Sequence, residues 1–310
     1  MKTIRAFTLV EVLVVIVIIS ILAALVTVAV AGAMRAGQRA RIGVQMSQIA
    51  MNLEHYKAEF GEYPPDMSDD DALVRHVKKR WPRYDAGNAQ QIRANLSTAY
   101  GNNVDFTVDL TNTNFSPSLG ALALWLGGFP NADGKLSGFG ADPENPFTIT
   151  NGVFDGKVFI DGEVGNDKNV RFVDFGGGVV PVIGNEIRDV FVPIVYFRGR
   201  TDGGEDAYRI NEGVKHFLFS GSFSEFGLCV PYVESERTNN DITTIKWHNP
   251  TTYQLIHPGL DGKFSAEVLL PPNSPPPSTR ITALGTGIGQ QDLDNITNFS
   301  DYKELKSILP

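Results

Sequence analysis

The chain has 310 residues, 42% hydrophobic and 20% charged, a composition typical of globular proteins that excludes disordered and collagen-like chains. Residues 1–60 carry six Lys/Arg against three Asp/Glu, a net charge of +3, whereas residues 61–310 carry a net charge of −11. We expect no nucleic-acid partner for so acidic a protein, because phosphate binding requires a basic face. The single cysteine, Cys229, excludes an intrachain disulfide and a Cys-based zinc site.

The N-terminus combines a short basic segment with a long apolar one. Residues 12–34 contain no charged side chain, and at 1.5 Å per residue they span about 35 Å, enough for a bilayer core of about 30 Å. Lys2 and Arg5 precede this run, which predicts a single membrane span with a cytoplasmic N-terminus. Glu11 lies at the N-terminal end of the predicted span. A carboxylate at this position is energetically costly and indicates a functional site with a partner. A secretory signal, with its shorter apolar core, and a plain membrane anchor are the alternatives.

Residues 6–15, Ala-Phe-Thr-Leu-Val-Glu-Val-Leu-Val-Val, resemble the class III signal of type IV pilins and pseudopilins. The resemblance implies that a membrane prepilin peptidase cleaves between Ala6 and Phe7 and methylates the new N-terminus, so that residues 1–6 form a leader peptide. It also implies that Glu11 neutralises the N-terminus of a neighbouring subunit during filament assembly. The family usually has Gly where this chain has Ala6. Because alanine is the next smallest residue, we expect cleavage, at reduced efficiency.

The N-terminal helix is predicted to continue beyond the membrane and to cover residues 7–61. Apolar residues recur on one face at steps of four and three, as in an amphipathic helix. They are Ile42, Met46, Ile49, Leu53, Tyr56 and Phe60. Gly61 and the prolines at 64–65 supply the stop signals. We expect the first half of this helix to serve as membrane anchor and filament core, and the second half to pack on the head.

Residues 62–310 are predicted to form the head. Ser68 followed by three aspartates predicts a helix that is capped by Ser68 and ends near residue 80, and two more helices are expected at 88–100 and 118–126. Short β-type runs separated by Gly, Asn and Asp predict an antiparallel sheet, with strands at 158–160, 170–175, 190–197, 216–219 and 253–256. The expected fold is α+β and pilin-like: a long helix, transmembrane and then amphipathic, packed on an antiparallel β-sheet head.

The sequence contains no motif that assembles an active site, and we expect no enzymatic activity. The five histidines form no short paired ligand motif, and His55 and His76 are interpreted as solvated surface residues. Segment 131–135 resembles a calcium loop only faintly and is interpreted as a turn. Cys229 lies between apolar neighbours and is interpreted as a small buried hydrophobe.

Three aspartates near the C-terminus are the stronger metal candidates. The strand at 253–256 runs into a turn at Asp261-Gly262, and Asp292 and Asp294 follow some thirty residues later. The order of these pieces resembles that of major pseudopilins, in which such a turn and a later acidic segment enclose one calcium ion. The resemblance implies Ca²⁺ held by Asp261 and by Asp292 or Asp294, together with backbone carbonyls. The alternative is a plain Asp-Gly hairpin turn and a capped helix near Asp294.

The resemblance covers about the first 65 residues and, more weakly, the last 60, so the head carries an enlarged insertion at about 68–250. It implies a structural subunit of a type II secretion pseudopilus that acts in protein secretion across the outer membrane. The implied partners are the prepilin peptidase, further copies of this chain, other pseudopilins and the inner-membrane assembly platform. The implied location is the inner membrane, as a single-pass protein with a periplasmic or extracellular head. The alternatives are a type IV pilus subunit or adhesin, and a membrane-tethered ectodomain with a binding or enzymatic activity of its own.

Overall fold

The computed structural model describes residues 8–101, 104–106, 117–165, 168–174, 179–187, 190–199, 208, 217–218, 228–229, 231–235, 246–264 and 290–308. The chain divides into two compact units, Met1–Arg41 and Ile42–Pro310. The predicted leader peptide, residues 1–6, lies outside the described residues.

Helix α1, Leu9–Phe60, contributes to both units. In the first unit its large apolar side chains are exposed, from Leu9 at 81% to Met34 at 64%. Among the described residues, α1 is the one helix that is long and apolar enough to cross a membrane. The predicted long N-terminal helix is therefore present, and its first part has the composition of a membrane span.

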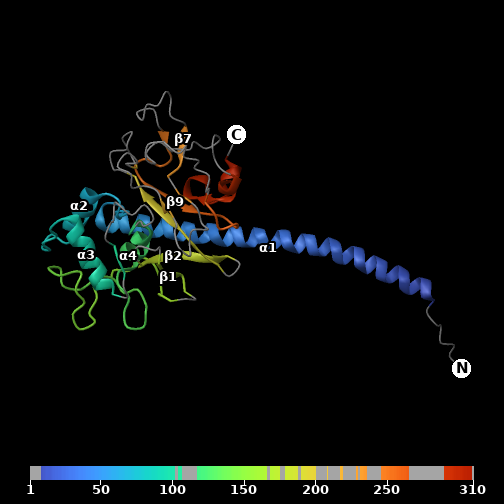
Figure 1. Cartoon of the computed structure of the whole chain (residues 1–310), viewed down its shortest axis with the longest axis horizontal. Coiled ribbons are helices and arrows are strands. Elements are labelled where there is room, and N and C mark those ends of the chain that lie inside the picture. The colour runs from blue at the N-terminus through green and yellow to red at the C-terminus, as the bar shows by residue number, and fades with distance from the viewer. Residues whose placement is uncertain are drawn as a thin grey trace. The chain divides into compact units, whose positions relative to one another are not determined.

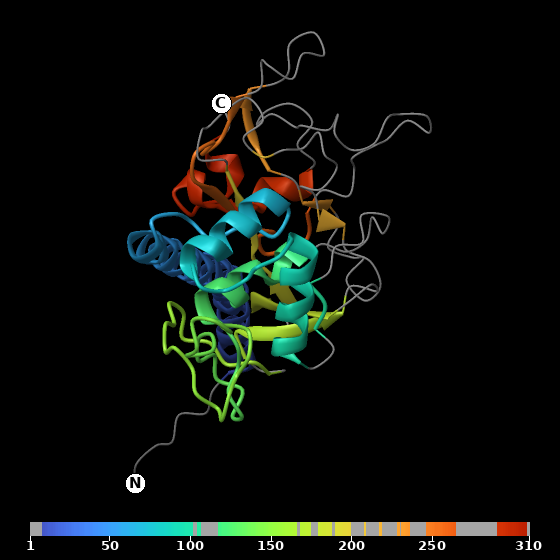
Figure 2. The ribbon, with the colours of Figure 1, turned by 90° about the vertical axis from the view of Figure 1, so that its left-hand side faces the viewer.

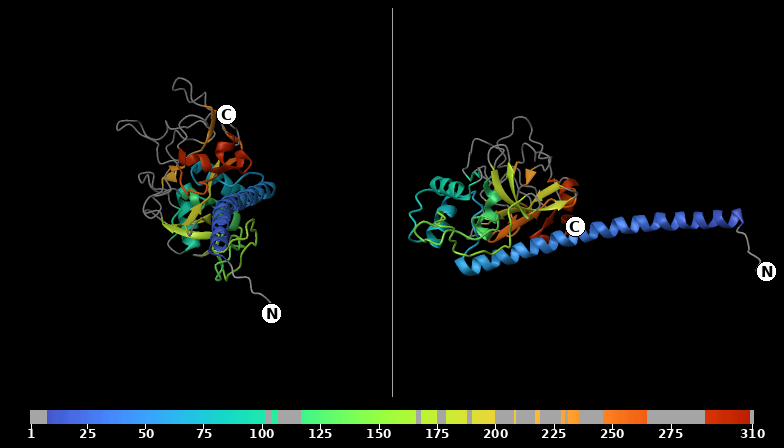
Figure 3. Two further views of the ribbon diagram at one scale, coloured as in Figure 1. Left: turned by 90° about the vertical axis from the view of Figure 1, so that its right-hand side faces the viewer. Right: turned by 90° about the horizontal axis from the view of Figure 1, so that it is seen from below.

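The second part of α1 packs on the head through one face, and the strands lie along one side of it (Figure 3, right). Its buried residues repeat at helical spacing and include the predicted apolar stripe except Phe60, which is only partly buried. They are Ile42, Met46, Ile49, Ala50, Leu53 and Tyr56. The helix ends at Phe60, and the next residue, Gly61, has a φ of 77°, in the left-handed region that favours glycine. The α+β, pilin-like architecture expected from the sequence is thus observed.

Two capped helices lie side by side on the head (Figure 2): α2, Asp70–Arg80, and α3, Ala89–Tyr100. The Asn88 side chain accepts a hydrogen bond from the Gln91 amide and begins α3 as predicted. At α2 the prediction of Ser68 as the cap is wrong. Ser68 donates its hydroxyl to Asp66 (2.6 Å), and Asp69 instead accepts from a first-turn amide of the helix.

The short helix α4, Ala121–Gly127, follows a 3₁₀ turn, η1, Pro117–Gly120, and forms the centre of the hydrophobic core. All seven residues of α4 are buried, and Trp125 is fully enclosed. A sequence that is apolar all round requires such a central position, because an amphipathic helix would bury only one face. Gly128, with φ of 72°, ends the helix near the predicted stop.

The described strands form two three-stranded and two two-stranded sheets, all with antiparallel pairing (Figure 1). The first sheet has the order β1-β2-β3, with β1, Val170–Asp174, β2, Val179–Ile187, and β3, Val190–Pro193. The second has the order β10-β9-β4, with β4, Val195–Arg198, β9, Tyr253–His257, and β10, Ile296–Thr297. The small sheets pair β5, Phe217–Leu218, with β6, Leu228–Cys229, and β7, Val233–Ser235, with β8, Lys246–Trp247. Three 3₁₀ helices, η6, Gln290–Asp294, η7, Asn298–Ser300, and η8, Leu305–Ser307, complete the described C-terminal part.

Two strand predictions differ from the structure. Segment 158–160 is not a strand, because the amides of Phe159 and Ile160 donate to the carbonyl of Leu126, in α4. The predicted strand at 190–197 is interrupted at Ile194. Before this break, β3 pairs with β2, and after it, β4 pairs with β9. One apolar run therefore provides an edge strand to each of two sheets.

Candidate functional site

The first turn of α1 brings Thr8 and Glu11 together. The Thr8 amide and hydroxyl both lie 2.8 Å from Glu11 Oε2, and the Glu11 amide donates to the Thr8 hydroxyl at 3.3 Å. These reciprocal bonds follow the pattern of a capping box, in which the two side chains satisfy amides that have no partner inside the helix. The role of Thr8 was not predicted from the sequence, although the Thr-x-x-Glu spacing at residues 8–11 is the signal for it. Ala6 and Phe7, the predicted cleavage site, lie outside the described residues.

Two hydroxyls within the apolar part of α1 also have partners in the helix itself. Ser20 donates to the carbonyl of Ile16 (2.7 Å), and Thr27 donates to that of Ala23 (2.8 Å). A polar group is costly in hydrocarbon unless its hydrogen bonds are made internally. These bonds therefore make both hydroxyls compatible with a membrane interior, which leaves Glu11 as the charged side chain of the segment.

At the C-terminus, the predicted acidic residues converge on the turn after β9. Asp294 Oδ2 accepts hydrogen bonds from the amides of Leu260 (2.8 Å) and Asp261 (3.2 Å). Asp261 Oδ1 accepts from the Lys263 amide, and Asp292 Oδ1 from the Asn295 side chain. The acidic segment of η6 is thereby attached to the loop that carries Asp261, as the sequence order implies.

The electrostatics of this acidic turn suit a cation. Partial burial and the neighbouring Asp294 and Asp292 raise the pKa of Asp261 to about 6, and burial also raises the pKa of Asp294. Close carboxylates resist joint ionisation unless a positive charge lies between them. In the described part of the chain, no three His, Cys, Asp or Glu side chains are arranged to hold a metal. Two carboxylates with backbone carbonyls, a donor set that Ca²⁺ accepts, do not require such a trio.

A second polar cluster, formed by Tyr56, Glu62, His76 and Arg198, lies inside the head. His76 Nδ1 is 2.9 Å from Glu62 Oε1, and its Nε2 is 2.7 Å from the Tyr56 hydroxyl. Arg198 Nη2 lies 2.9 Å from the other oxygen of Glu62. The interpretation of His76 as a surface residue is wrong: it is 1% exposed, because it lies on the inward face of α2. The cluster is closed to solvent and joins α1, α2 and β4, which is a structural role.

The remaining sequence interpretations concern single residues and a turn. His55 is exposed, as expected. Cys229 is 2% exposed, and burial raises the pKa of its thiol, so the interpretation as a small buried hydrophobe is confirmed. The Asn131 side chain accepts from the amides of Asp133 and Lys135, which makes segment 131–135 a turn, as interpreted.

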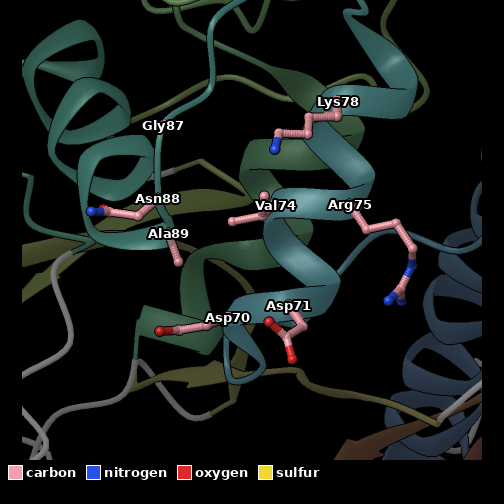
Figure 4. Close-up of a pocket in the computed structure, with 8 residues that line it drawn as sticks. All are labelled: Asp70, Asp71, Val74, Arg75, Lys78, Gly87, Asn88 and Ala89. Carbon is pink, nitrogen blue, oxygen red and sulfur yellow. The ribbon is translucent and has the colours of Figure 1, made fainter.

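An open cavity of about 660 Å³ lies between α2 and the start of α3 (Figure 4). It is lined by Asp70, Asp71, Val74, Arg75, Lys78, Gly87, Asn88 and Ala89. Val74 points toward α3, whereas Arg75 extends away from it. Asp70 is already paired with Arg93 at 2.6 Å. The charged groups do not converge on one point, and none of the residues predicted to be functional lines this cavity.

Comparison with known proteins gives one match, at the N-terminus. Residues 1–27 match the family model of the prokaryotic N-terminal methylation motif. The chain carries the class III signal of type IV pilins and pseudopilins. This prepilin-type signal contains Ala6, Phe7 and Glu11, and the capping turn of Thr8 and Glu11 lies within it. No curated protein and no solved structure gives a significant match.

Proposed function

We propose that this chain is a structural, non-enzymatic subunit of a type II secretion pseudopilus. In this proposal prepilin peptidase removes residues 1–6 and methylates Phe7 in the inner membrane. The apolar part of α1 then joins a helical filament with other copies and other pseudopilins on the inner-membrane assembly platform. The N-terminus faces the cytoplasm, and the head lies in the periplasm or outside the cell.

The observation that carries this proposal is the prepilin-type signal followed directly by an exposed apolar helix with Glu11 in its first turn. The motif supports a type IV pilin-like or pseudopilin subunit and implies processing by prepilin peptidase. Glu11 uses Oε2 for both bonds from Thr8. Its other carboxylate oxygen can therefore accept the N-terminal ammonium of a neighbouring subunit while the cap stays formed.

The C-terminal acidic turn favours a pseudopilus over a pilus. Pilins often hold the C-terminal loop with a disulfide, which one cysteine cannot form within this chain. We also propose that Asp261 and Asp294, with backbone carbonyls of the turn, hold one Ca²⁺ that takes over this role. The supporting observation is that the bonds from Leu260 and Asp261 to Asp294 already join the two segments. A bound cation would neutralise the carboxylates and strengthen that connection.

Substitution of Glu11 tests the assembly role. Glu11→Ala and Glu11→Gln should both insert into the membrane and fail to form filaments, as measured by carbonate extraction and by electron microscopy of sheared fractions. The Gln variant keeps a hydrogen-bond acceptor for Thr8, so it separates the charge from the cap. Glu144→Ala, at an exposed acid of the head, is the matched control. A normal filament yield from the Ala variant would overturn the proposal.

The appearance of the filaments separates the alternatives. Short filaments within the envelope support a pseudopilus, whereas long surface filaments assign the chain to a type IV pilus, with the enlarged head as an adhesin. A chain that keeps Met1 and forms no filament would instead be a tethered ectodomain. Intact-mass analysis of the protein from its native membrane makes this distinction first.

A further inference from the structure

Three arginines follow the apolar part of α1: Arg35, Arg39 and Arg41. The 42 residues between Glu11 and Glu54 contain no acidic side chain, so these charges are not balanced along the helix. Arg35 and Arg41 are exposed, and neither forms an ion pair or a side-chain hydrogen bond within the described part of the chain. Both belong to the first unit, Met1–Arg41.

The position of these arginines along the helix corresponds to a bilayer. Arg35 follows Glu11 by 24 residues, which is about 36 Å at 1.5 Å per residue. The hydrocarbon core is about 30 Å thick, and the headgroup layers extend a few ångströms beyond each side. If Glu11 lies at one boundary of the core, Arg35 therefore lies in the opposite headgroup layer. Arg41 lies about 9 Å farther along the helix axis, roughly 8 Å outside that layer. Its long side chain can reach back to the headgroups, because helical side chains point toward the N-terminus of the helix.

The direction of the side chains distinguishes lipid from a protein partner. At about 100° per residue, Arg35 and Arg41 project about 120° apart around the helix. A second helix or a neighbouring head packed on one side would contact one of these directions. A headgroup layer surrounds the helix and can contact both.

We infer that Arg35 and Arg41 bind the phosphates of anionic lipid headgroups at the outer boundary of the membrane and thereby set the depth of α1. This inference rests on the proposed membrane-spanning, processed state. Guanidinium groups bind phosphate through paired hydrogen bonds, and long side chains reach the headgroup layer from a helix end. Cleavage after Ala6 removes Lys2 and Arg5, so in the mature chain Arg35 and Arg41, together with Arg39, are the basic side chains that flank the span.

Lipid titration of the purified, processed chain, which begins at Phe7, in detergent tests the inference. Bound lipids are counted by native mass spectrometry as phosphatidylglycerol or zwitterionic phosphatidylethanolamine is added. The wild-type chain should bind phosphatidylglycerol more tightly. A basic residue near an anionic surface contributes about fivefold in affinity, so the double variant Arg35→Gln/Arg41→Gln should bind it about 30-fold more weakly. Its binding of phosphatidylethanolamine should not change.

Two further double variants act as controls. Arg35→Lys/Arg41→Lys keeps both charges and should keep the preference for the anionic lipid. Lys78→Gln/Lys79→Gln removes two exposed charges from α2, in the head, and should leave lipid binding unchanged. Equal binding of both lipids by the wild-type chain overturns the inference, as does an anionic preference that survives the Gln variant.

The same samples separate this inference from the proposed function. If the chain resists carbonate extraction and forms filaments but its lipid preference does not depend on the arginines, the inference alone fails. If carbonate extracts the wild-type chain, the membrane-spanning proposal fails. Salt-sensitive self-association without lipid, lost in the Gln variant and accompanied by no lipid preference, would assign the arginines to a second copy of the chain and overturn lipid binding.

Discussion

At the scale of single residues, His76 connects elements of the head through both ring nitrogens, which contact Glu62 and Tyr56. His76→Phe preserves an aromatic ring but removes both hydrogen bonds from a buried position. An unsatisfied buried polar group costs about 1–3 kcal/mol, so we expect the free energy of unfolding to fall by about that amount. Urea unfolding of the full-length chain in detergent measures it. His55→Phe, at an exposed histidine of α1, should change it by less than about 0.5 kcal/mol; equal effects would contradict the structure.

The same cluster predicts a pH dependence. Burial lowers the pKa of His76 to about 4, from an ordinary value of 6.5. Burial opposes ionisation of Glu62, but the hydrogen bond from His76 and the ion pair with Arg198 outweigh it and lower the pKa of Glu62 to about 2. The unfolded chain therefore binds more protons, and the stabilisation by His76, complete above pH 6.5, is lost as the pH falls toward 4. We expect the stability difference between wild type and His76→Phe to shrink over that range; a constant difference would contradict a neutral buried His76.

The acidic turn should change the stability of the fold with pH in the opposite direction. The pKa of Asp261 is raised to about 6, so without a cation the turn destabilises the fold as the pH rises from 3.8 to 6. Added Ca²⁺ should raise the melting temperature more at pH 7.5 than at pH 5, because protons compete for Asp261 at the lower pH. A ligand at 100 times its Kd stabilises by about 2.7 kcal/mol. Asp261→Asn should abolish the shift, and Asp133→Asn, in the turn at 131–135, should keep it; an undiminished shift in Asp261→Asn would exclude this calcium site.

Sequence reasoning found the residues of the acidic turn but assigned His76 to the surface. The three aspartates were identifiable because the turn and the later acidic segment keep a recognisable order along the chain. His76 follows Leu73 by three residues and precedes Val77, so it lies on the apolar face of α2. The many charged residues of this helix led instead to the surface interpretation. The partners of His76, Tyr56 and Glu62, belong to α1 and the segment after it, so only the packing of α2 on α1 reveals the cluster.

At the scale of elements, substitution of two glycines of α1, Gly43 and Gly37, should have different effects on stability. A Cβ at Gly43 would lie 3.0 Å from the carbonyl oxygen of Tyr302, in the C-terminal segment, whereas Gly37 has nothing within 4 Å. Gly43→Leu should therefore displace the C-terminal segment and lower the free energy of unfolding by about 1–3 kcal/mol. Gly37→Leu should instead slow amide exchange around residue 37, since leucine favours helix over glycine by nearly 1 kcal/mol. Equal unfolding curves for the two variants would show that the C-terminal segment does not pack on Gly43.

The elements that the sequence predicts well are those with local signals. Asn88 and the glycines at 61 and 128 mark helix ends, because capping depends on the residues next to the helix. The strands are less predictable, since pairing is decided by distant segments. The run at 190–197 has β-type residues throughout, and only the positions of β2 and β9 explain its division at Ile194.

At the scale of the whole molecule, the function of the N-terminal signal can be inferred from the sequence alone, whereas the function of a surface on the head cannot. The peptidase reads consecutive residues, so a match over residues 1–27 carries its meaning without the fold. A binding surface on the head would be assembled from distant segments, as the contact of Arg198 with Glu62 in the buried polar cluster illustrates. The assembly pathway is therefore inferred from the sequence, whereas cargo and filament neighbours are properties of the assembled surface.

Processing changes the charge of the whole molecule and so provides the last prediction. Loss of residues 1–6 removes Lys2 and Arg5, which takes the formal net charge from −8 to −10. It also creates the ammonium that Glu11 of a neighbour pairs with in the proposed assembly. Isoelectric focusing and intact mass should show a chain that begins at Phe7 with one added methyl group. Ala6→Gly, which restores the residue usual in the family, should be cleaved faster, and Ala6→Leu should remain uncut. Because the uncut variant keeps Glu11 and the whole of α1 but lacks the ammonium, it should enter the membrane and form no filaments; filaments built from it would show that assembly does not require the processed N-terminus.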